Sequence, residues 1–111
     1  MRWLVIAAAV GVAWALLRSR EPAWYRDLVL RAYAADQIPL PGAPLEPAAA
    51  VALELDLPIA WVQQLGQADA VALELAARRV KAAVLAAPPA DTSPATLAAY
   101  KSAALAAGGV T

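Results

Sequence analysis

Apolar residues run without a break through the start of the chain and then recur at helical spacing. Residues 3–17 (WLVIAAAVGVAWALL) carry no charge and stand between Arg2 and Arg18. As a helix they would be about 22 Å long, against about 30 Å for the hydrocarbon core of a bilayer. A helix that is apolar all round is buried in lipid or against a partner. We therefore interpret residues 1–20 as an uncleaved, single-span transmembrane anchor.

Two alternatives compete with the anchor. A secretory signal peptide also has a short apolar run after an early basic residue, but residues 18–22 (RSREP) form a poor cleavage site. A core helix of a soluble domain normally keeps a polar face, which residues 3–17 lack. The Ala and Gly residues of the segment would let neighbouring membrane helices approach closely.

Aromatic and basic residues flank this apolar run. Trp and Tyr gather at the headgroup layer, and Arg side chains reach it with their guanidinium groups. For Trp24 and Tyr25, plain core packing is an equal alternative. The predicted membrane-interface residues are Arg2, Trp3, Trp14, Arg18, Arg20, Trp24, Tyr25 and Arg26.

The flanking charges also predict an orientation. Arg2 stands on one side of the anchor, whereas Arg18, Arg20, Arg26 and Arg31 follow on the other. Because basic residues favour the cytoplasmic side, we expect a single-pass membrane protein whose C-terminal body lies in the cytoplasm or in a virion interior.

Residues 21–37 predict an amphipathic helix next to the membrane. Pro22 suits the first turn, where its missing N–H is not needed. Residues 38–47 (IPLPGAPLEP) hold four prolines and a glycine, which predicts an extended linker. The expected apolar stripe of the helix consists of Trp24, Leu28 and Ala35, with Tyr25, Val29 and Ala32 alongside.

Residues 48–111 predict a small domain of short helices. We expect helices over 47–57, 58–66, 70–87 and 94–107, with Asp69 and Ser93 as N-caps and Gly66 just after a helix. Glu74 precedes Arg78 by four residues, a supportive spacing. The expected buried face of helix 70–87 is Leu73, Ala77, Val80 and Val84. The predicted fold is all-α: one transmembrane helix, a Pro-rich linker and a small helical bundle.

Composition excludes several kinds of chemistry. The chain contains no His and no Cys, so zinc sites of the usual kind and Ser-His or Cys-His catalysis are ruled out. Net charge is zero, and no basic run is interleaved with aromatic residues, so we expect no nucleic-acid partner. We expect no cofactor and no metal.

Carboxylates are the remaining candidate catalytic groups. Glu54 and Asp56 are two residues apart and would point about 200° apart on a helix, so they do not converge as an acid–base pair. Glu54 lies in a mainly apolar segment, where a raised pKa would suit a general acid. It is the single minority candidate for a catalytic residue.

Three segments resemble the phage-type lytic transglycosylases, which cleave peptidoglycan and are often tethered by a short hydrophobic helix. WYRDLVLRAYAADQIP (24–39) is similar to their opening helix, ATLAAYKSA (95–103) to the helix with their AAYNAG motif, and WVQQLGQADA (61–70) to their Gly-Leu-Met-Gln segment. Their catalytic Glu is normally followed by Ser, whereas Glu54 is followed by Leu55. Lys101 stands in place of their Asn. The resemblance therefore implies a trimmed, inactive relative.

A structural function fits these observations better than an enzymatic one. We expect a non-catalytic, single-span small subunit that docks on and stabilises a larger membrane assembly or a membrane-containing virion. Its partners would be the lipid bilayer and other membrane-protein subunits or virion proteins. The alternative is a membrane-tethered, lytic transglycosylase-like protein or its inactive relative.

Overall fold

The computed structural model describes residues 21–110. The predicted anchor and the interface residues Arg2, Trp3, Trp14, Arg18 and Arg20 lie outside this range. Within it every element is helical and no strand occurs, as the all-α prediction requires. None of the helices between residues 21 and 110 combines the length and the apolar character that crossing a bilayer demands.

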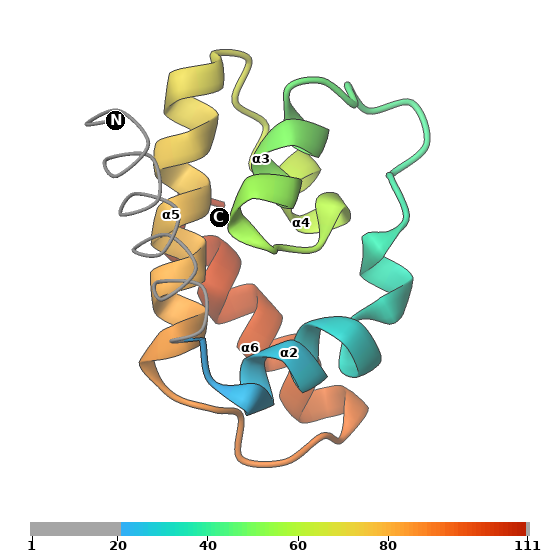
Figure 1. Ribbon diagram of the computed structural model, residues 1–111, viewed down its shortest axis with the longest axis vertical. Helices are drawn as coiled ribbons and strands as arrows, with labels where there is room; N and C mark the ends of the chain where they lie inside the picture. Colours follow the sequence, from blue (N-terminus) through green and yellow to red (C-terminus); the bar gives the residue numbers. More distant parts are fainter. Residues whose placement is uncertain (1–20, 111) are drawn as a thin grey trace, which may run out of the picture.

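Two long helices and several short ones build the body (Figure 1). Helix α5 runs along the body, with α6 packed against it and α3 packed against both α5 and α4. The elements are α2 (Ala23–Asp27), the π-helix η1 (Leu28–Ala32), the 3-10 helix η2 (Ala34–Gln37), α3 (Ala48–Leu55), α4 (Ile59–Gln64), α5 (Ala70–Ala86) and α6 (Pro94–Ala107).

The longer helices begin and end where local signals predict. The Asp69 carboxylate accepts a hydrogen bond from the Ala72 N–H at the start of α5, and the Ser93 hydroxyl accepts one from the Thr96 N–H at the start of α6. These side chains satisfy backbone donors that have no partner inside the helix. Both predicted N-caps are confirmed. The predicted buried face of α5 is confirmed as well, since Leu73, Ala77, Val80 and Val84 are all buried.

The prediction of one continuous helix over residues 21–37 is wrong, because the segment is divided into α2, η1 and η2. After Asp27 the helix widens into a π-turn, in which the Tyr33 N–H donates to the Leu28 carbonyl. Each residue of a π-turn rotates by less than an α-helical residue does. Tyr33 is thereby brought to the buried side, and Ala32, predicted on the buried stripe, is exposed. A 3-10 turn follows, in which Ala35 is exposed as well.

The predicted linker, residues 38–47, contains no helix and is attached to α4 at Gln63. The Gln63 side chain holds it there by two hydrogen bonds. Its carbonyl accepts from the Leu40 N–H at 2.5 Å, and its amide donates to the Pro44 carbonyl at 3.3 Å. The linker is therefore attached to the body instead of acting as a free spacer.

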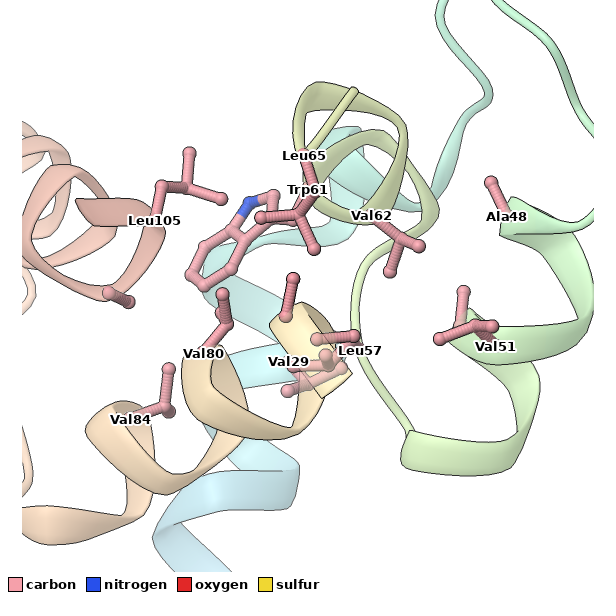
Figure 2. Close-up of a cluster of buried hydrophobic side chains, with 14 of the residues drawn as sticks. Val29, Ala48, Val51, Leu57, Trp61, Val62, Leu65, Val80, Val84 and Leu105 are labelled. Atoms are coloured by element: carbon pink, nitrogen blue, oxygen red, sulfur yellow. The ribbon is translucent and has the colours of Figure 1, made fainter. Parts of the chain in front are cut away.

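One hydrophobic core joins the α-helices and η1 (Figure 2), whereas η2 contributes no buried residue. The Trp61 ring lies between Val80 of α5 and Leu105 of α6 and is almost fully buried. Because Tyr25, Leu28, Val29 and Tyr33 belong to the same core, the segment predicted as a separate juxtamembrane helix is part of the body.

Gly108 lets the end of α6 approach α5 and the residue after α4 closely. A β-carbon placed on this residue would lie 2.6 Å from Cγ2 of Val80 and 2.8 Å from Cδ2 of Leu65. Both neighbours are buried and have no open space into which to move. The glycine is required here by packing, because its backbone angles are ordinary.

Candidate functional site: an apolar groove between α2 and α3

One hollow of the body, which we call the α2–α3 groove, has a volume of about 470 Å³ and is open to solvent. Apolar side chains form most of its surface. It is lined by Glu21, Tyr25, Arg26, Val29, Leu30, Gln37, Ala49, Ala52, Leu53, Asp56, Leu57 and Ile59.

The two sides of the groove are tied together through Tyr25. Its ring is buried in the core, and its hydroxyl donates a hydrogen bond of 2.7 Å to the Asp56 carbonyl. Asp56 ends α3 in a left-handed conformation, with φ of 53°, which turns the chain sharply toward α4. Burial, with Glu21 and Asp56 nearby, raises the pKa of Tyr25 well above its usual range. The hydroxyl therefore stays protonated and able to donate.

An ion pair closes one end of the groove. Lys81 of α5 donates to the Glu21 carboxylate at 2.5 Å and to the Leu55 carbonyl at 2.6 Å. The side chains of Lys81 and Glu21 are only 17% and 12% exposed, so solvent screens this pair less than it screens surface pairs. The Lys81 ammonium group therefore joins three segments: the start of the body, the end of α3 and the middle of α5.

Two leucines project from the rim of the groove on opposite sides. Leu30 of η1 is 69% exposed and Leu53 of α3 is 77% exposed. Arg26 also lines the groove, and it makes no ion pair with any residue between 21 and 110. The polar residues of the lining are Glu21, Tyr25, Arg26, Gln37 and Asp56. Tyr25 and Glu21 are already bound within the body, so the surface that the groove offers is mainly apolar.

A second hollow, of about 620 Å³, lies where α2 and η1 face the loop between α5 and α6. It is open and mostly apolar. Arg31, one of its charged residues, is bound to Asp27 on the same helical face at 3.4 Å. The lining residues are Trp24, Asp27, Leu28, Arg31, Ala32, Pro88, Pro89, Thr92 and Leu97.

A polar cluster near the core serves the fold. The Asp36 carboxylate accepts from the Trp61 indole N–H at 2.9 Å and from Lys101 at 3.3 Å. Tyr33 stacks edge-on against the Trp61 ring, with centroids 4.5 Å apart, and donates to the Leu97 carbonyl. Burial raises the pKa of Tyr33 to about 12. Each polar group here has a partner inside the body, so the cluster joins η2, α4 and α6 and leaves no group for a ligand.

The structure separates the predicted site residues that it describes. Tyr25 is 1% exposed, so its assignment to the membrane interface is corrected: core packing occupies the ring. Trp24 is half-buried and Arg26 is exposed. Glu54, the candidate catalytic residue, is exposed on α3, lies 3.7 Å from Arg78 and lines neither hollow.

Sequence reasoning did not identify the leucines of the rim. Leu53 carries no local signal, because a leucine on a helix is usually a core residue. For Leu30 a clue was available, since it lies off the stripe defined by Leu28 and Val29. In the part of the chain described, no three acidic side chains come close enough together to hold a metal ion.

Comparisons of the chain with protein families, with characterised proteins and with solved structures gave no match.

Proposed function

We propose that the protein is a non-catalytic, single-span small subunit that docks on and stabilises a larger membrane assembly or a membrane-containing virion. The apolar run over residues 3–17 supports the membrane location. The α2–α3 groove, with Leu30 and Leu53 exposed at its rim, is the observation that carries the docking role. Contiguous apolar surface of this kind marks interaction sites in proteins.

Positioning is the mechanism that these features support. The anchor would hold the chain in the bilayer by packing its small residues against neighbouring helices. The body would then present one defined surface, because hydrogen bonds from Tyr25 and Lys81 fix α3 against α2 and α5. The basic residues after the anchor favour a cytoplasmic or virion-interior body.

The geometry gives little support to the peptidoglycan-cleaving alternative. Glycoside hydrolysis needs a carboxylic acid inside a sugar-binding cleft, opposite a second carboxylate or an activated water. Glu54 lies outside the groove, is exposed and pairs with Arg78. We assign no catalytic residue and no cofactor.

Isolation of the tagged full-length chain in mild detergent, with native mass determination of the eluate, tests this function. We expect the chain in the membrane fraction, eluting at constant stoichiometry with other membrane or virion proteins. As a control, Val10→Arg places a charge in the middle of the apolar run, which disfavours insertion by about 2.5–3.5 kcal/mol, and should lose both properties. Elution of the wild-type chain alone, as a folded monomer, would overturn the subunit role.

A further inference from the structure

The α2–α3 groove begins within a short length of chain from the predicted anchor. The apolar run of that anchor ends at Leu17, and Glu21, the first described residue, already lines the groove. Four residues of fully extended chain span at most about 14 Å. The headgroup layer is itself about 5–7 Å thick on each side of the hydrocarbon core. A body that starts at Glu21 is therefore held at or near the membrane surface.

The groove cannot move far from this point of attachment. Glu21 is bound to Lys81, and Lys81 also holds the Leu55 carbonyl at the end of α3. Tyr25, four residues after Glu21, donates to the Asp56 carbonyl. These hydrogen bonds hold both walls of the groove close to Glu21, the first described residue after the anchor.

The exposed groups of this face suit the boundary between headgroups and acyl chains. Leu30 and Leu53 offer apolar side chains on either side of one opening, and apolar side chains are buried at that boundary when a helical surface binds a membrane. Arg26 also lines the groove and makes no ion pair within residues 21–110, and its guanidinium fork is of the kind that binds phosphate. Of the two carboxylates that line the groove, Glu21 is neutralised by Lys81, and Asp56 is half-buried at the end of α3.

From this geometry we infer that the α2–α3 groove faces the bilayer, with Leu30 and Leu53 embedded in its interfacial layer and Arg26 on lipid phosphates. The inference rests on the proposed function and deepens it: of the surfaces that a membrane assembly offers, the α2–α3 groove meets the lipid. Apolar burial drives the seating, so phosphatidylcholine alone suffices.

Labelling by single cysteines tests the inference in the full-length chain, which contains no cysteine of its own. Leu30→Cys and Leu53→Cys place an environment-sensitive fluorophore at the groove. Val71→Cys is the matched control, because Val71 is 65% exposed and apolar, yet lies ten residues, or about 15 Å, along α5 from Lys81. Each variant is reconstituted in phosphatidylcholine vesicles and titrated with spin-labelled lipid and with aqueous iodide.

We expect quenching by spin-labelled lipid to be at least about twofold stronger at positions 30 and 53 than at position 71, with the reverse order for iodide. Equal accessibility of all three positions to iodide, in vesicles that still float with the protein, overturns the seating while leaving the anchor intact. Protection of the groove positions from both quenchers overturns it too, because another protein or a second copy then covers the face. Failure of the wild-type chain to float with vesicles removes the proposed function and this inference together.

Discussion

Lys81 and Glu21, sixty residues apart in the chain, are joined by an ion pair of 2.5 Å. The same ammonium group donates to the carbonyl of Leu55. One side chain of α5 therefore holds both the start of the body and the end of α3. The walls of the α2–α3 groove depend on this contact.

Removal of the Lys81 charge should loosen the groove. Lys81→Met leaves the Glu21 carboxylate and the Leu55 carbonyl without their partner, and we expect a loss of about 2–3 kcal/mol in the free energy of unfolding. Urea unfolding of the full-length chain in detergent, followed by circular dichroism, measures this loss. Arg79→Met is the matched control: Arg79 is exposed on the same helix and should change stability by less than about 0.5 kcal/mol. Equal effects of the two substitutions would show that the ion pair contributes nothing.

The Asp36 carboxylate should matter more as a hydrogen-bond acceptor than as a charge. Asp36→Asn keeps an oxygen for the Trp61 indole N–H and should cost less than about 1 kcal/mol. Asp36→Leu leaves that buried donor unpaired and should cost about 2 kcal/mol. The same unfolding measurement applies to both variants. If Asp36→Asn proved as damaging as Asp36→Leu, the ion pair with Lys101 would be the dominant contact.

Gly108 should not tolerate a β-carbon. Gly108→Ala places a methyl group against Val80 and Leu65, and overpacking of this kind costs about 1–3 kcal/mol. The cost should shrink in a Val80→Ala background, where the clash with Cγ2 of Val80 is absent and only that with Leu65 remains. A thermodynamic cycle of the two single variants and the double variant measures this coupling. Strictly additive effects would contradict the close approach.

The tyrosines should make the body sensitive to alkali. Burial raises the pKa of Tyr33 to about 12, and the pKa values of Tyr25 and Tyr100 are raised as well. When the pKa of a tyrosine is higher in the folded than in the unfolded state, its contribution to the free energy of unfolding is fully present below about pH 10. That contribution is lost as the pH rises further. Each tyrosine that stays protonated only in the folded state contributes a slope of about 1.4 kcal/mol per pH unit.

Absorbance of tyrosinate and circular dichroism, recorded together between pH 8 and about pH 13, test this expectation. Ionisation of the tyrosines should coincide with unfolding and should lie well above pH 10. Ionisation of all three near pH 10, with the helical signal intact, would mean that their hydroxyls are solvated.

Glu54→Gln should leave the protein unchanged. The Glu54 side chain is 54% exposed, and its ion pair with Arg78 is 3.7 Å long, so the substitution should alter stability by less than about 0.5 kcal/mol. We expect neither the wild-type chain nor the variant to release fragments from purified cell walls. Wall digestion by the wild-type chain that is abolished in Glu54→Gln would instead establish the peptidoglycan-cleaving alternative.

Local signals in the sequence were enough to predict the two long helices. Asp69 and Ser93 accept hydrogen bonds from backbone N–H groups only three residues away, and Pro94 and Gly108 delimit α6. The Glu74–Arg78 pair is equally local. Such features are set by neighbours along the chain, so the residue types suffice to predict them.

The groove was beyond prediction, although several of its lining residues had been noticed. Arg26 was predicted to lie in the headgroup layer, and Tyr25 either there or, equally, in the core. Leu30 and Leu53 were not identified at all. Their exposure depends on how η1 and α3 sit relative to each other, and this follows from hydrogen bonds between residues 31 and 60 positions apart.

The sequence by itself determined the all-helical character, the helix ends and the kinds of chemistry that the chain lacks, because these follow from residue type and short-range spacing. Tertiary structure alone decided the π-turn that buries Tyr33, the inclusion of residues 25–33 in the common core and the opening between α2 and α3. These features depend on which distant segments pack together. That packing is driven by the burial of apolar surface over the whole body, which no single position in the sequence reveals.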